Sequence, residues 1–319
     1  MNYPIILLHT GNPPFLEIAI NRLQLQNSAE IILLGDDSNQ SIKGVSHYHV
    51  KDYFENAQNF EDNYYLHMSS NSYGFELICY QRWFVIEEFI KQHDYKMFWY
   101  LDSDVLIYGD LGKYVDSITQ GQTFDLIGFD TRFSGKGDSF MPAFNCYSPK
   151  LISAFIQFFK DSYTDREIFE ILRKKWRKHA SQRIPGGICD MTQLKLFFDL
   201  NQSKYSIYNS YDLDNKQIPD GNINSEFNYT EKNYKFRMLN GKKRVIVKNF
   251  RAYGYLNDGK RVDFIALHFQ GKKAKLSMGD YAKENYNPDS VINSIKYALN
   301  KSINNTLRPL KNIVKSILK

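Results

Sequence analysis

Two aspartates, Asp102 and Asp104, stand where an apolar run of sequence ends, and their spacing suggests chemistry. The run before them is Lys96-Met-Phe-Trp-Tyr-Leu, and Val105-Leu-Ile follows. The pattern predicts a buried strand whose alternate side chains share a face, with both carboxylates near its carboxyl end. Adjacent carboxylates repel each other and are costly to desolvate, and a hard divalent cation is the usual compensation. We therefore interpret the pair as metal ligands.

A second Asp-x-Asp triplet, Asp212-Leu-Asp214, serves as a control within the same chain. Such a triplet arises by chance about once in a chain of this length, so sequence context must separate the two. The second triplet lies in a polar stretch rich in Tyr, Asn and Lys, without a solid apolar run before it. We expect a solvated loop there. For Asp102 and Asp104 the alternative is a turn in which the side chains bond their own backbone.

Strands and helices alternate around the aspartate pair. The sequence predicts a strand over 3–10, a helix over 15–25 and a strand over 30–35, which is the opening of a parallel sheet. A helix over 75–90 leads into the aspartate strand, and strands at 124–130, 142–149 and 262–268 follow. No G-x-G-x-x-G segment occurs, which argues against a dinucleotide cofactor of the usual kind. These patterns predict an α/β fold.

The segment Phe98-Trp-Tyr-Leu-Asp-Ser-Asp-Val-Leu-Ile-Tyr resembles the DxD segment of GT-A-fold glycosyltransferases. Other segments resemble glycosyltransferase family 8 and its relatives, and the resemblance covers most of residues 1–275 in order. It implies a GT-A-like (Rossmann-like) mixed sheet flanked by helices. It also implies an enzyme that uses Mn²⁺ or Mg²⁺ and a nucleotide-sugar donor, with a UDP-sugar as the expected donor.

The end of the last strand resembles the His-x-x-Gly-x-x-Lys motif of family 8. By this resemblance His268 is the third metal ligand, Gly271 belongs to the nucleotide-binding segment, and a lysine binds the diphosphate. The position six residues after His268 is Ala274, so the lysine is displaced by one position, to Lys273 or Lys275. Imidazole with carboxylates suits Mn²⁺, and lysine pairs well with phosphate. The alternative is that His268, which closes an apolar strand, is a core residue whose hydrogen bonds are made within the protein.

The resemblance also points to residues around the donor sugar. It assigns a sugar contact to Arg82, for which the alternative is a salt bridge to Asp102 or Asp104. It places Asn145 in a strand under the sugar, although Cys146-Tyr147 replaces the small residues usually found there.

Two further carboxylates are candidate catalytic groups. Asp190 follows a Gly-Gly loop at the start of a helix, where the resemblance expects an acidic residue near the reacting sugar and where helix capping is the alternative. Asp130 ends the 124–130 strand. The resemblance implies a retaining reaction, but either carboxylate could be the base of an inverting one.

Polar residues follow the first two strands as well. His9, Thr10, Asp36 and Asp37 fall at strand ends, on the edge where open α/β sheets bind ligands. GT-A enzymes hold the nucleotide base and ribose there. The alternative is that these side chains stabilise turns or cap helices.

Charge is concentrated at one end of the chain. The net charge is +6, and residues 290–319 carry six basic residues and no acidic one, so the remainder is nearly neutral. This distribution argues against a nucleic-acid-binding surface on the body. The tail repeats apolar residues at steps of three or four, which predicts a basic amphipathic helix that packs on the body or docks on an anionic membrane surface. Upstream, the basic run Arg173-Lys-Lys-Trp-Arg-Lys178 is either a solvated helix face or an anionic-acceptor site.

Together these features predict a cytoplasmic glycosyltransferase, peripheral on the inner face of the membrane. Three widely spaced cysteines form neither a disulfide framework nor a zinc motif, and no run is long enough to span a bilayer. The predicted acceptor is a glycan or lipid-linked glycan of bacterial surface-polysaccharide synthesis. The predicted domains are a catalytic domain over 1–285, with a nucleotide-binding half (1–108) and an acceptor and sugar half (109–285), and a tail over 286–319.

Two other functions compete with this prediction. A sugar nucleotidyltransferase would carry a Gly-rich basic loop after the first strand, where this chain has His9-Thr-Gly-Asn-Pro-Pro. A non-catalytic sugar-binding or scaffold protein could keep the same fold without turnover.

Overall fold

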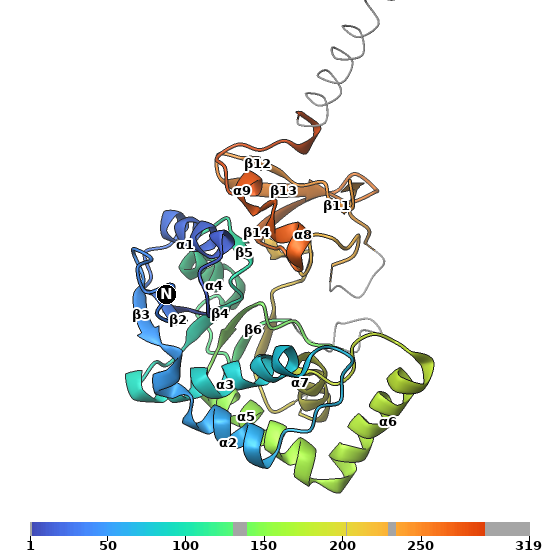
Figure 1. Cartoon of the computed structure of the whole chain (residues 1–319). Helices are drawn as coiled ribbons and strands as arrows, with labels where there is room; N and C mark the ends of the chain where they lie inside the picture. Colours follow the sequence, from blue (N-terminus) through green and yellow to red (C-terminus); the bar gives the residue numbers. More distant parts are fainter. Residues whose placement is uncertain (1, 130–138, 202, 229–233, 291–319) are drawn as a thin grey trace, which may run out of the picture.

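The fold is built on a seven-stranded and a five-stranded sheet (Figure 1). A computed structural model describes residues 2–129, 139–201, 203–228 and 234–290. Asp130 and the basic tail from residue 291 onward lie outside the described residues.

The larger sheet has the strand order β3-β2-β1-β4-β7-β6-β8. β1 pairs in parallel with both β2 and β4, whereas β7 runs antiparallel to its neighbours β4 and β6. The predicted mixed sheet is therefore confirmed, and it takes strands from both predicted halves of the chain. Its strands are β1 (Ile5–Leu8), β2 (Ile31–Gly35), β3 (Ser46–His49), β4 (Phe98–Leu101), β6 (Leu126–Gly128), β7 (Phe144–Tyr147) and β8 (Ile207–Asn209).

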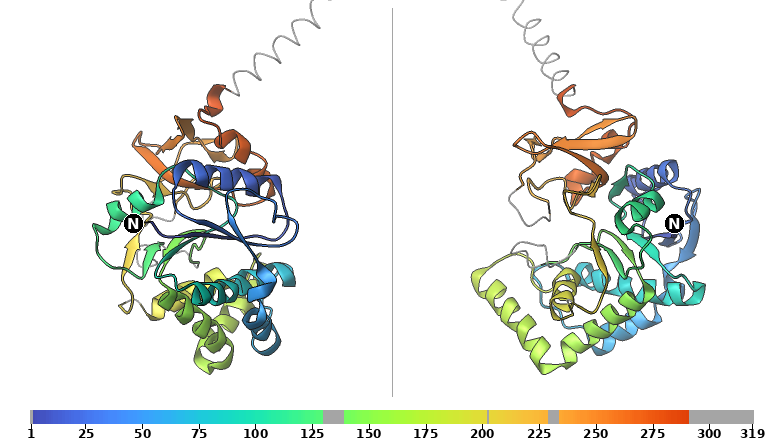
Figure 2. Two further views of the ribbon diagram at one scale, coloured as in Figure 1. Left: turned by 90° about the vertical axis from the view of Figure 1, so that its left-hand side faces the viewer. Right: turned by 180° about the vertical axis from the view of Figure 1, so that it is seen from behind.

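Helices cover both faces of this sheet, with α1 on one face and α3 and α5 on the other (Figure 2, left). Strands covered on both faces read as continuous apolar runs, and every residue of β2 and β4 is buried. Within the described residues, no helix is both long enough and apolar enough to cross a membrane. The helices are α1 (Pro14–Gln26), the 3₁₀ turn η1 (Val50–Tyr53), α2 (Glu55–Asn63), α3 (Tyr73–His93), α4 (Leu111–Thr119), α5 (Pro149–Thr164), α6 (Arg166–Gln182), α7 (Asp190–Leu200), α8 (Lys272–Lys275) and α9 (Met278–Tyr281).

The second sheet brings a late part of the chain against the aspartate segment. Its order is β12-β13-β14-β5, with β9 parallel to β14. The pairing of β5 with β14 is antiparallel and sets His268 opposite Val105. A separate hairpin, β10 with β11, turns at Asn240 and Gly241 with φ of 51° and 75°, an Asn-Gly sequence typical of tight hairpin turns. The strand bounds are β5 (Val105–Ile107), β9 (Ile218–Pro219), β10 (Met238–Leu239), β11 (Lys242–Lys243), β12 (Ile246–Lys248), β13 (Arg251–Tyr255) and β14 (Arg261–His268).

The aspartate pair lies on the connection between the two sheets. We expected strand geometry through Asp104, and this was wrong. Residues 102–104 form a turn, closed by a hydrogen bond from Val105 N to Asp102 O at 3.1 Å, after which the chain enters the second sheet. Farther along the chain, Asp165 ends α5 and caps α6, so residues 149–182 form two helices. Asp212 and Asp214, by contrast, lie in the expected exposed turn, with Asp214 N donating to Asp212 Oδ1 at 3.0 Å.

A buried ion pair fixes the segment after β9. Lys243 Nζ lies 2.7 Å from Asp220 Oδ1, and both side chains are almost completely buried. Lys243 Nζ also donates to the carbonyl oxygens of Asn222 at 2.7 Å and Phe227 at 3.1 Å. Neither Asp220 oxygen accepts a well-aligned hydrogen bond from any described residue, so Lys243 alone offsets its charge at close range. Removing one partner of such a pair leaves an uncompensated buried charge.

We expect Lys243→Met to lower the free energy of unfolding by about 3–5 kcal/mol, because it leaves the Asp220 carboxylate buried without a cation. The double variant Asp220→Asn with Lys243→Met should recover a large part of that loss. Urea denaturation of the wild type and both variants measures the difference. Lys242→Met, on the same hairpin but only half-buried, is the matched control and should cost less than about 1 kcal/mol. Equal losses for Lys242→Met and Lys243→Met would contradict this account of the pair.

Candidate metal centre

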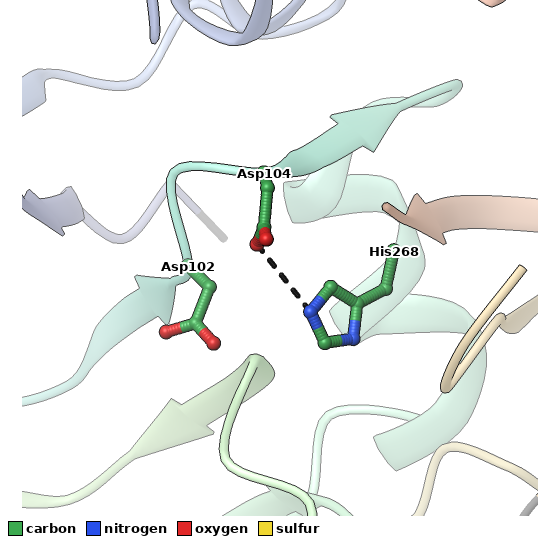
Figure 3. Close-up of side chains that lie close together, drawn as sticks. All are labelled: Asp102, Asp104 and His268. Carbon is green, nitrogen blue, oxygen red and sulfur yellow. Dashed lines mark ion pairs between the residues drawn. The ribbon is translucent and has the colours of Figure 1, made fainter. Parts of the chain in front are cut away.

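Asp102, Asp104 and His268 form a cluster in which one ligand atom from each residue lies within 4.8 Å of the others (Figure 3). The two carboxylates come from the turn after β4, and the imidazole comes from the end of β14. Asp104 Oδ1 is 3.3 Å from His268 Nε2. Two carboxylates and an imidazole are a ligand set that suits Mn²⁺, and Mg²⁺ would use the carboxylates. The residues present therefore fit the predicted metal.

The ring of His268 is oriented by a backbone carbonyl. Its Nδ1 donates to Gly221 O at 2.8 Å, which leaves Nε2 toward the cluster. The residue is 4% exposed. Burial alone would lower the pKa of His268, but the hydrogen bond and charge of Asp104 outweigh it and raise the pKa to about 9. The metal-free cluster thus holds an imidazolium, whose proton a metal must displace.

Asp104 is the most enclosed carboxylate of the cluster, at 7% exposed. Its Oδ2 lies 3.0 Å from Lys275 Nζ, so it contacts one cation through each oxygen. Burial acts to raise the pKa of Asp104, but His268 and Lys275 together hold it below its usual value. Asp104 is consequently an anion whose charge the protein offsets with two groups that could move aside for a metal and a phosphate.

The short helix α8 decides which lysine reaches the cluster. Ala274 is buried, Lys273 is exposed, and Lys275 turns toward Asp104 with its ammonium 4.7 Å from the ring centre of Phe15. Gly271 begins this helix as its N-cap with φ of 88°, a conformation that favours glycine. Of the two displaced lysines, the structure brings Lys275 to the site and leaves Lys273 on the surface.

Arg82 joins the cluster to Asp190. Its guanidinium contacts Asp102 Oδ1 at 3.0 Å and Asp190 Oδ2 at 2.5 Å. The expected salt bridge to Asp102 is therefore present, and the contact with a donor sugar stays a prediction. Tyr100 also donates to Asp102 Oδ1 at 3.0 Å, so both contacts use the same oxygen and Oδ2 remains for a cation. Burial opposes the charge of Arg82, but Asp190, Tyr100 and Asp102 raise its pKa well above the usual value.

Asp190 is buried and fully engaged. Trp83 Nε1 donates to its Oδ2 at 3.1 Å, and Met191 N donates to its Oδ1 at 2.8 Å. The N-cap of α7 is Cys189, so Asp190 is the first residue of the helix, where a carboxylate is favoured by the helix dipole. Its role in the reaction stays a prediction. In this structure the Asp190 carboxylate is held in an ion pair with Arg82.

The predicted nucleotide residues lie at the carboxyl ends of β1 and β2. His9 Nδ1 bonds Ser103 Oγ at 2.9 Å, which ties the first strand to the turn between the aspartates. Burial, with the nearby Lys275, lowers the pKa of His9. Asp36 accepts from Gly11 N at 2.7 Å and from Ser38 Oγ at 2.5 Å, contacts that belong to a turn. Thr10 is exposed, as is Asp37, which pairs with His49.

Asn145 lies inside the sheet rather than at its edge. The residue is completely buried, and its Nδ2 donates to Met141 O and Tyr147 Oη, both at 2.8 Å. Phe129 N donates to its Oδ1 at 3.3 Å. The amide is satisfied by the protein, a geometry that does not favour the predicted sugar contact.

Sequence reasoning assigned no role to the segment that orients His268. Gly221 supplies the carbonyl, and the same loop is held by Asn222 and Asn224, which donate to Gln270 Oε1 and O at 2.8 and 2.9 Å. Pro219-Asp-Gly221 carries an ordinary turn signature. That signal indicates a loop and does not reveal which side chain the loop supports.

Comparisons with known proteins place the chain beside glycosyltransferases. No protein-family model matches the sequence, and no curated protein matches it. Among solved structures, mouse xyloside xylosyltransferase 1 in its apo form is similar at 10% identity and a TM-score of 0.46, over 70% of this chain and 87% of that one. The galactosyltransferase LgtC, solved with donor and acceptor sugar analogs, is similar at 12% identity and a TM-score of 0.41, over 88% and 95%.

A further similar structure is the glycosyltransferase GlyE of Streptococcus pneumoniae, at 16% identity and a TM-score of 0.34, over 68% of this chain and 47% of that one. All three proteins belong to the class that the sequence motifs indicated.

We expect Mn²⁺ to bind the wild-type protein and to bind Asp104→Asn at least about tenfold more weakly, because the variant loses a charged ligand. Isothermal titration with MnCl₂ measures both affinities. The matched control is Asp214→Asn, which removes the same charge from the exposed Asp-x-Asp triplet and should leave the affinity unchanged. A wild-type affinity that Asp104→Asn does not reduce would rule out the cluster as the metal site.

Proposed function

We propose that this chain is a metal-dependent glycosyltransferase that takes a sugar from a nucleoside-diphosphate sugar, with UDP-sugars the first candidates. The observation that carries the proposal is the convergence of Asp102, Asp104, His268 and Lys275 at the junction of two sheets. Three metal ligands beside a lysine can hold a diphosphate through both a cation and a direct ion pair. The carboxyl ends of β1 and β2 adjoin this point, where open α/β sheets bind ligands.

In this proposal Asp102 Oδ2, Asp104 and His268 Nε2 hold Mn²⁺ or Mg²⁺. The bound metal would neutralise negative charge on the departing nucleoside diphosphate. Lys275 would exchange its contact with Asp104 Oδ2 for a phosphate oxygen. His9 and Asp36 would border the nucleoside, and the surface residues Thr10, Gly271 and Lys273 would border the open side of the donor.

The sugar would lie on the Arg82 side of the cluster. Arg82 is shared by Asp102 and Asp190, which couples the metal ligands to the carboxylate nearest the predicted sugar position. Asp190 would orient a sugar hydroxyl or act as a base, and Asp130 is the other candidate base. The acceptor would be a glycan or lipid-linked glycan of bacterial surface-polysaccharide synthesis.

With Mn²⁺ and a panel of nucleotide sugars, we expect one donor to release nucleoside diphosphate. Asp104→Ala should lower that rate at least about 100-fold, and Asp214→Ala should not change it.

Lys275→Ala should weaken nucleoside-diphosphate binding without weakening Mn²⁺ binding, because it removes a phosphate partner and a cation that competes for Asp104. Release of pyrophosphate in place of nucleoside diphosphate would indicate a nucleotidyltransferase. No donor binding or turnover with metal present would favour a non-catalytic protein.

We further propose that the protein works in the cytoplasm, on the inner face of the membrane, and that the basic tail over residues 290–319 provides the contact. The tail carries six basic residues and no acidic one, which supports this proposal because anionic lipids attract such segments. Deleting residues 291–319 should release the protein from vesicles that contain anionic lipid, measured by co-sedimentation. If the deletion leaves the bound fraction unchanged, the tail is not the membrane contact.

A further inference from the structure

A basic cleft of about 430 Å³ lies between α6 and α7, apart from the metal cluster. Four lysines line it, and Ile171 and Leu196 contribute apolar surface. α6 stands at the periphery of the molecule, with α7 beside it (Figures 1 and 2). We call this feature the lysine cleft. Its lysines are Lys174, Lys175, Lys178 and Lys195.

The basic run of α6 is divided between two faces of the helix. Arg173 contacts Glu170 at 2.7 Å, and Arg177 approaches the same carboxylate at 4.0 Å. Neither arginine lines the cleft, whereas Lys174, Lys175 and Lys178 do. The arginines therefore form the solvated face that the sequence allowed, and the lysines are collected on the side of α7.

Positive charge in the cleft exceeds what its own acid can offset. Asp199 is the acidic residue among the described lining residues, and Lys195 Nζ contacts both of its oxygens at 2.7 Å. Among the described lining residues, Lys174 and Lys178 thus bring two positive charges in addition to that pair. His179 also lines the cleft, and its Nδ1 is buried without a hydrogen-bond partner among the described residues. An anion would balance the charge of Lys174 and Lys178.

The apolar part of the lining narrows the choice of anion. Ile171 in the lining is 49% exposed and Leu196 is half-buried, so both present apolar surface to the cleft, whereas Leu172 is buried. A free inorganic anion would use the lysines and leave this surface in water. A ligand with an anionic head and a hydrocarbon chain would use both, since lysine pairs with phosphate and burial of apolar area is favourable.

Helix α7 connects the lysine cleft to Arg82 and, through Arg82, to the metal centre. Thr192 lines the cleft and accepts from Lys175 Nζ at 3.0 Å, two residues after Asp190. Asp190 contacts Arg82, and Arg82 contacts Asp102. A ligand held in the cleft would therefore lie along the helix whose first residue borders the predicted sugar position.

We propose that the lysine cleft binds the phosphate and the first part of the hydrocarbon chain of a lipid-phosphate-linked acceptor. This inference rests on the proposed glycosyltransferase function and names its acceptor class. The lysines hold the phosphate, Ile171 and Leu196 contact the chain, and α7 connects this anchor to the reacting end of the acceptor.

The test is the binding of farnesyl phosphate, an isoprenoid phosphate, by isothermal titration to the full-length protein below its micelle concentration. Lys174→Ala with Lys178→Ala should weaken binding at least about tenfold, because two charged contacts are lost. Arg173→Ala with Arg177→Ala removes the same charge from the other face and should change binding less than about twofold. If both double variants weaken binding equally, the ligand is attracted to the basic helix in general, and the proposal that it binds in the lysine cleft is wrong.

Two further ligands test the chemistry of the proposal. Farnesol should bind at least about tenfold more weakly than farnesyl phosphate, and so should inorganic phosphate. Equal binding of farnesol would overturn recognition of the anion, and equal binding of inorganic phosphate would overturn recognition of the chain.

Donor hydrolysis separates this inference from the proposed function. Mn²⁺-dependent release of nucleoside diphosphate without acceptor should be the same in the wild type and in the lysine double variant, since neither lysine belongs to the metal centre. Release in both proteins without selective binding of farnesyl phosphate would overturn the cleft alone. Selective binding without hydrolysis of any donor would overturn the acceptor role together with the proposed function.

Discussion

The negative charge of Asp104, held at 7% exposure, is the constraint on which the site depends. A buried carboxylate is stable only beside positive charge. Here His268 comes from the end of β14 and Lys275 from α8, so the carboxylate constrains where these two elements lie. The same requirement explains why a histidine that is 4% exposed keeps its proton. A metal could replace part of that charge without any rearrangement of the strands.

A second balance of charge lies on the other side of the turn. Asp102 and Asp190 are both anionic, and Arg82 serves both from the middle of α3. On one side of the cluster, the Arg82 guanidinium offsets the negative charge of Asp102. On the other side, the His268 imidazolium and the Lys275 ammonium offset the charge of Asp104, and a metal ion could take over this role. A cationic ligand would therefore enter from the His268 side. On the other side, Arg82 is held between two carboxylates.

Local patterns in the sequence were enough to predict β1, β2, β4, β6, β7 and β14, the helices α1 and α3, and the polar residues at strand ends. Periodicity and apolar runs carry that information, since each depends on neighbours only a few residues away. The pairing of β5 with β14 could not be predicted in this way, because it joins Val105 to His268. Local patterns also do not say whether an asparagine in an apolar strand faces a ligand or the interior, and Asn145 faces the interior. The choice between Lys273 and Lys275 needed the short helix α8, whose single buried residue is Ala274.

The pairing of β5 with β14 also has a consequence for synthesis of the chain. The ribosome adds residues from the amino terminus, so β1, β2 and β4 are available to pair before the second sheet can be completed. β5 then waits as an unpaired edge, with Asp104 beside it, until more than 150 further residues have been added. His268, Lys275 and the Gly221 carbonyl all arrive in that late portion. A nascent chain would hold the carboxylates but not the groups that complete the ligand set, and it would acquire the metal centre only when its second sheet closes.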